Sequence, residues 1–104
     1  MRQAKKEYLN SYLLQEAKIS RIKNLMQLNP ELIEDYRREL NCSLELRQKI
    51  EKQINSVDGG VLSELLFQKY VFGKTLEDIS YVLNYSTRHI ERLHIKALEK
   101  FKME

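Results

Sequence analysis

The chain has 104 residues, of which 42% are hydrophobic and 32% are charged, and it carries a formal net charge of +3. This size fits one small domain with or without an appendage, and the apolar content excludes wholesale disorder. Three Gly residues and one Pro argue against an all-β fold, and a single Cys excludes an intrachain disulfide and a cysteine-based zinc site. No apolar run is long enough for a membrane span or a signal peptide, so we expect a reducing, cytoplasmic setting.

The first half of the chain predicts an N-terminal antiparallel helical hairpin, coiled-coil-like, over residues 1–58. Helix-forming residues dominate 4–28, and a second helix is expected over 30–57. Asn29 before Pro30 is a typical helix start, with the Asn as the cap and the Pro in the first turn. The pattern therefore predicts an all-α arm in which the chain folds back at this dipeptide.

The apolar stripes of the two predicted helices agree along their length when they are folded back on each other. The expected seam residues are Tyr8, Tyr12, Ile19, Ile22 and Met26 on the first helix, and Ile33, Tyr36, Leu40, Leu44, Ile50, Ile54 and Val57 on the second. The same fold-back brings Glu16 within about one turn of Arg47, which predicts a cross-helix ion pair. A second face of the first helix, with Leu14, Leu25 and Leu28, hints at self-association, as does Ile95.

The sequence Asp58-Gly59-Gly60 marks the boundary to a second unit, residues 61–104. Three helices are expected there, over residues 61–72, 75–83 and 87–101, with breaks at Gly73 and at Asn84-Tyr85-Ser86. Thr75 and Ser86 stand at the capping positions of the second and third helices. A short helix, a tight turn and a longer helix are the layout of a helix-turn-helix motif.

The last predicted helix has an apolar side and a basic side. Its apolar residues, which fall within about 80° of one another, are Ile90, Leu93, Ala97 and Phe101. The opposite arc carries Arg88, His89, Arg92 and Lys96. Lys and Arg neutralise phosphates, and Arg also reaches guanine bidentately, so this pattern is what a helix in the major groove of DNA requires.

The run from Thr75 to Phe101 resembles the promoter-reading helix-turn-helix, region four, of primary and extracytoplasmic sigma factors. The family frame T-L-E-E-I-A-x-x-L-G-x-S-x-x-x-V-x-x-x-x-x-x-A-L-x-x-L matches without a gap. The departures that matter for the turn and the packing are Asn84 in place of Gly and Ser80 in place of Ala; Asn tolerates the left-handed conformation, so the turn should survive. Residues 85–98 and 6–9 also resemble small phage and prophage transcription regulators of Gram-positive bacteria, which join a helical hairpin to a sigma-like tail.

This resemblance implies a set of DNA contacts. Contacts to base edges or nearby phosphates are implied for Thr87, Arg88, His89 and Arg92. Lys74 and Lys96 would contact phosphates, and the N-terminal turn at Thr75 would offer backbone N–H groups to a phosphate. Glu91 stands where many relatives carry a base, although an acid can accept from cytosine N4.

Two functions from different classes remain open, and a third requires no DNA binding. The first is a DNA-binding transcription regulator, expected as a homodimer on double-stranded DNA. The second is a small-terminase-like recognition subunit of phage DNA packaging, which a ring of eight or more copies would indicate. The third is a protein-interaction module in which the sigma-like unit docks RNA polymerase. A dimer would read half-sites about 34 Å apart or a multiple of that.

The residues offer no catalytic, metal or cofactor site, and we expect no enzyme. His89 and His94 are five residues apart, not the four that bring two imidazoles together on a helix, so we expect His94 to pack structurally. Cys42 is expected to be a free, inert thiol on the outer side of its helix. For Tyr81 we favour packing over stacking on bases.

Overall fold

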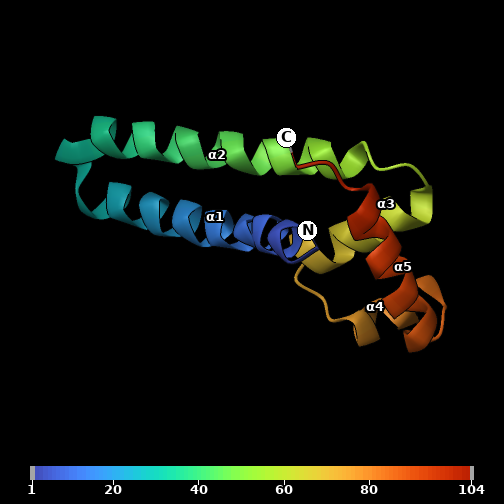
Figure 1. Ribbon diagram of the computed structural model, residues 1–104. Helices are drawn as coiled ribbons and strands as arrows, with labels where there is room; N and C mark the ends of the chain where they lie inside the picture. The colour runs from blue at the N-terminus through green and yellow to red at the C-terminus, as the bar shows by residue number, and fades with distance from the viewer. Residues whose placement is uncertain (1, 104) are drawn as a thin grey trace.

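The computed structural model describes residues 2–103, and every regular element in this range is helical, which confirms the all-α prediction. The α-helices are α1 (Arg2–Leu28), α2 (Ile33–Asn55), α3 (Gly60–Leu66), α4 (Leu76–Leu83) and α5 (Thr87–Lys100) (Figure 1). Within the described range, no helix combines the length and the apolar character that crossing a bilayer would require. We call residues 2–55 the arm and residues 60–103 the head.

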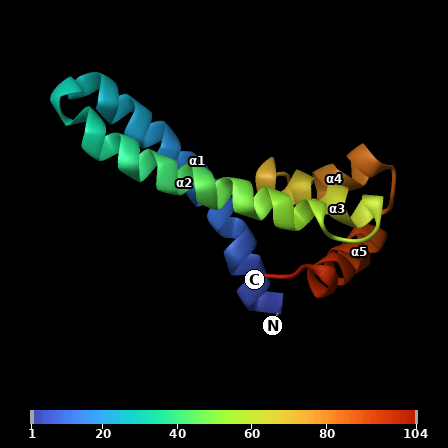
Figure 2. The same ribbon diagram turned by 90° about the horizontal axis from the view of Figure 1, so that it is seen from above.

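The arm consists of α1 and α2, which run antiparallel and reverse direction at residues 29–32 (Figure 1). Figure 2 shows the two helices side by side at the far end of the arm and separating near the head, where α5 approaches the start of α1. The molecule is consequently elongated, with principal extents of 52 × 28 × 21 Å.

Polar contacts between α1 and α2 hold the register that the sequence predicts to within about one helical turn. The predicted ion pair is confirmed, because the Arg47 guanidinium donates a hydrogen bond to the Glu16 carboxylate. The Tyr12 hydroxyl also donates to Glu51 Oε2, at 2.5 Å. Since the side chains of Arg47 and Glu16 are 28% and 42% exposed, their pairing contributes about 0–1 kcal/mol and serves register more than stability.

The tip of the arm differs from the sequence prediction in two respects. Asn29 does not cap the second helix; its side-chain Nδ2 donates to the Leu25 carbonyl at the end of α1, at 3.3 Å. Pro30–Leu32 form a 3-10 turn, so α2 begins only at Ile33. Ile33, predicted in the seam, is exposed, because the tip is only two helices thick and has nothing else to pack against.

The base of the arm and the head share one hydrophobic core. Its buried members are Leu9, Tyr12, Ile50, Ile54 and Val57 next to Leu62, Leu66, Tyr70, Ala97, Leu98 and Phe101. Lys5 Nζ donates to the carbonyls of Leu98 and Glu99, at 2.8 and 3.3 Å, and so satisfies the C-terminal end of α5. The predicted boundary at Asp58–Gly60 is thus a change of chain direction, across which the core continues.

The predicted helix over residues 61–72 is two elements. α3 ends at Leu66, and a π-helical turn follows over Phe67–Val71, in which the Phe72 amide donates to the Phe67 carbonyl at 3.0 Å. Gly73 ends the helical segment, because its φ of +71° lies outside the helical region, in a conformation that other residues rarely adopt. The chain then turns toward α4.

Candidate nucleic-acid interface

A small apolar cluster fixes α4 against α5. Leu65, Ile79 and Ile90 are its fully buried members, and the partly buried Leu76, Leu83 and Leu93 pack around them. These positions lie on the inner sides that the helical spacing predicts, so the orientation of α5 about its own axis is set by packing.

Side-chain caps fix the starts of both α4 and α5. Thr75 Oγ1 accepts from the Asp78 amide and Ser86 Oγ accepts from the His89 amide, each at 3.1 Å, as the predicted caps require. Asn84 adopts the left-handed conformation, with φ 61° and ψ 43°. The buried Ser80 donates its hydroxyl to the Glu77 carbonyl at 2.6 Å, so the polar atom at this position is satisfied.

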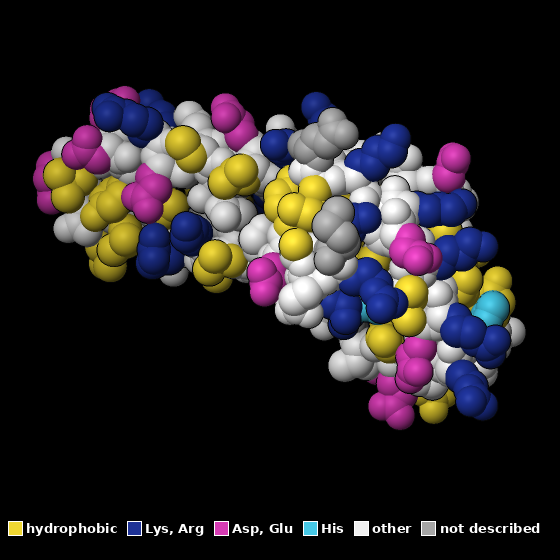
Figure 3. Space-filling model, viewed as in Figure 1, with side chains coloured by type: hydrophobic (Ala, Val, Ile, Leu, Met, Phe, Trp, Pro, Cys, Tyr) yellow, Lys and Arg dark blue, Asp and Glu magenta, His cyan; other side chains and the backbone are white. Residues whose placement is uncertain are grey.

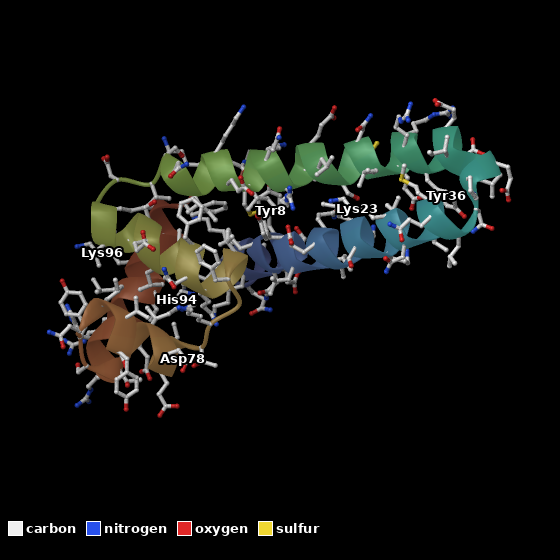
Figure 4. All side chains as sticks on the ribbon, turned by 180° about the vertical axis from the view of Figure 1, so that it is seen from behind. Tyr8, Lys23, Tyr36, Asp78, His94 and Lys96 are labelled. Atoms are coloured by element: carbon white, nitrogen blue, oxygen red, sulfur yellow. The ribbon has the colours of Figure 1, made fainter. Side chains whose placement is uncertain are left out.

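The structure brings most of the predicted contact residues together on α5. Thr87, Arg88, Arg92 and Lys96 are exposed on it, and Figure 4 shows Lys96 directed away from the body of the protein. His89 is half-buried, with its ring edge-on to Tyr85 at a centroid distance of 4.9 Å. Lys74 and Thr75 lie apart from this row, at the start of α4, where Thr75 is exposed and Lys74 half-buried.

The positive charges of the head have no ionic partners among residues 2–103. The ion pairs of the structure lie within the arm, namely Arg21–Glu39, Arg37–Glu34 and Arg47 with Glu16 and Glu51. Between residues 60 and 103, no Lys or Arg lies within 4.0 Å of a carboxylate of another described residue. Figure 3 shows many Lys and Arg side chains, with Asp and Glu side chains among them, over the end of the molecule that α3, α4 and α5 form. The Lys and Arg side chains are therefore free to neutralise an external polyanion.

His94 is buried beneath this face and makes a structural contact, as expected from the sequence. Its Nε2 lies 2.7 Å from the Tyr70 hydroxyl, and the residue is only 6% exposed. Burial is the main cause that lowers the pKa of His94 to about 4, and the charges of Lys69 and Lys6 lower it further. Burial likewise raises the pKa of Tyr70 to about 12. Among residues 2–103 no three or more His, Cys, Asp or Glu side chains are grouped to hold a metal ion.

His94 is expected to make the protein acid-sensitive. An unfolded chain takes up this proton near pH 6.5, whereas the folded protein takes it up only near pH 4, so stability falls as the pH falls between these values. The difference corresponds to about 3 kcal/mol. Urea unfolding of the wild type and His94→Gln at pH 7 and pH 4.5 checks this, since Gln does not titrate. Equal losses of stability in both proteins would assign the acid sensitivity to other groups.

Tyr81 corrects the sequence prediction, which favoured packing. It is 83% exposed on α4, and Phe72 and Val82 nearby in sequence are also exposed. The exposure of Tyr81 could have been predicted from the sequence, because the helical period places it about 160° from the buried Ile79. Cys42 is free and exposed on α2, as expected.

Comparisons of the chain with models of known protein families, with curated proteins and with solved structures found no match.

Proposed function

We propose that the protein binds double-stranded DNA as a helix-turn-helix transcription regulator, with α5 lying in the major groove. The observation that carries the proposal is the row of exposed basic side chains Arg88, Arg92 and Lys96, none of which is paired with an acid of the described chain. Because the apolar side of α5 is buried against the rest of the head, these basic side chains face outward. An exposed guanidinium on such a helix has the donors to bind guanine O6 and N7.

The ends of α4 and α5 support the same function. Two capped helices joined by a left-handed Asn84 have the layout of a helix-turn-helix, in which the first helix crosses the phosphate backbone. Lys74 and the backbone at Thr75 lie at the start of α4, where a phosphate would meet them. The pattern of residues 85–98, which resembles that of small phage and prophage regulators, favours a role in transcription, in a cytoplasmic setting.

A second candidate function follows from exposed apolar side chains on α4 and in the segment before it. Phe72 and Tyr81 are 64% and 83% exposed, and such side chains in a small protein favour a protein partner. In this alternative the head docks RNA polymerase and the basic face is secondary. A third alternative, a packaging role in a small-terminase-like ring, requires eight or more copies. The mass of the assembly in solution distinguishes it from the other two.

Selection of fragments from random DNA, followed by a salt titration of the best fragment, tests the proposal. If the four cationic side chains Lys74, Arg88, Arg92 and Lys96 each neutralise about one phosphate, affinity falls about 100-fold between 50 and 200 mM salt. We expect selection to enrich one sequence motif and the titration to show this dependence. Failure to enrich any motif, or affinity independent of salt, would contradict the proposal and favour the protein-docking alternative.

A further inference from the structure

We infer that the outer side of α1 pairs with the same side of a second copy of the chain, antiparallel and around a two-fold axis at Arg21. The residues of this surface, which we call the outer stripe, are Leu14, Ala17, Arg21, Leu25 and Leu28. At 100° per residue it lies on the side of α1 opposite the buried Tyr12, Ile19 and Ile22. Its Leu and Ala members therefore lie on the side of α1 away from α2, while the Arg21 side chain at its centre reaches Glu39 of α2 at 3.4 Å.

The outer stripe exposes large apolar side chains that no described element covers. Leu14 is 54% exposed and Leu28 is 75% exposed, while Leu25 is half-buried. A single exposed Leu needs no explanation, but a row of them over four turns of one helix marks a contact surface. The two arm helices alone cannot bury this row, because α2 occupies the other side of α1.

The spacing of the stripe is self-complementary. In an antiparallel pair centred on Arg21, Leu14 lies opposite Leu28 of the partner subunit, because both are seven residues from the axis. Ala17 lies opposite Leu25 of the partner subunit, so a small side chain leaves room for a large one. A two-fold interface requires this kind of match, since the same surface serves both copies.

The charges favour the antiparallel over the parallel arrangement. Residues 1–28 carry six Lys and Arg and two acids, whereas residues 29–35 carry three acids and no base. An antiparallel pair places the acidic tip of each arm along α1 of the other copy, which carries more bases than acids, and a parallel pair would place the two acidic tips together. At the axis, each Arg21 is already 3.4 Å from Glu39 of its own chain, which offsets the repulsion between the two guanidinium groups.

This pairing would place two heads at opposite ends of the dimer. The start of α1 meets the head around Lys5 and Leu9, about 14 residues from Arg21, so the heads would be about 40 Å apart along the arms. That distance is similar to one turn of B-DNA, about 34 Å, the separation of half-sites for paired recognition helices. The inference that the two heads bind neighbouring half-sites rests on the proposed function. The inference that two copies of α1 pair does not depend on DNA binding.

A cysteine on the proposed axis tests the pairing without DNA. In a Cys42→Ser background, Arg21→Cys should form a disulfide with its own copy, because a residue on a two-fold axis faces its equivalent. The matched control is Arg38→Cys, which replaces an exposed Arg of α2 outside the stripe. We expect the axis variant to cross-link at least about 10-fold faster under mild oxidation. Equal rates would overturn the inference.

The mass of the protein in solution provides the second measurement. The contact spans only about 20 Å of helix, so light scattering should show a monomer–dimer equilibrium between about 10 and 500 µM. Leu28→Glu should keep the monomer mass over that range and the helical content of the wild type. A wild-type protein that stays monomeric, or a Leu28→Glu variant with an unchanged equilibrium, would overturn the inference. Since neither measurement contains DNA, a failure to bind DNA leaves the result for the dimer intact.

Discussion

Replacing both Arg88 and Arg92 by Ala is expected to abolish the preference for the selected DNA fragment. Each guanidinium that binds a guanine bidentately discriminates by about 1–3 kcal/mol, so the double variant should lose at least about 30-fold in affinity for that fragment. Its affinity for random DNA should fall much less, because the other phosphate contacts remain. Fluorescence anisotropy on the two fragments measures both effects.

The fold of this variant should be unchanged, which makes the result interpretable. Both Arg side chains are exposed and make no ion pair within the part of the chain that the structure describes, and Ala is a strong helix former. The matched control is Arg37→Ala with Arg38→Ala, which removes the same charge from the exposed side of α2. We expect this control to keep the preference for the selected fragment. If the Arg88 and Arg92 variant binds as the wild type does, α5 is not the recognition helix.

The features of the head that depend only on residues close in sequence could be predicted from the sequence. The caps at Thr75 and Ser86 each use a hydrogen bond to a backbone amide three residues on, and the left-handed turn at Asn84 depends on one residue type. The amphipathic period placed Ile90 inside and Arg92 outside for the same reason. Such features follow from local chemistry, and the remainder of the chain hardly changes them.

The features that escaped prediction depend on what surrounds each helix. The Asn29 side chain could bind either the end of α1 or the start of α2, and in the structure it donates to a carbonyl at the end of α1. Ile33 fits the helical seam but lies where the arm has no third layer. Which residues join the arm to the head could not be predicted either, since periodicity shows which side of a helix is apolar and not which helix covers it. Long-range packing supplied the rest of the fold.

Leu9→Ala is expected to destabilise the head although the substitution lies in the arm. Leu9 is fully buried in the core that joins the two parts, where a Leu-to-Ala change costs about 2–5 kcal/mol. That is a large fraction of the about 5–15 kcal/mol by which small proteins are stable. Urea unfolding followed by circular dichroism should show one transition at a lower midpoint, because neither part can keep its core without the other.

The control for Leu9→Ala is Leu46→Ala, which removes a Leu that is 47% exposed on α2 and should change stability by no more than about 0.5 kcal/mol. Amide exchange then resolves where the protein opens. If arm and head form one unit, amides of α5 lose protection in Leu9→Ala as those of α1 do. If the amides of α5 keep their wild-type protection while α1 opens, the head holds the recognition surface by itself, and the arm serves another purpose.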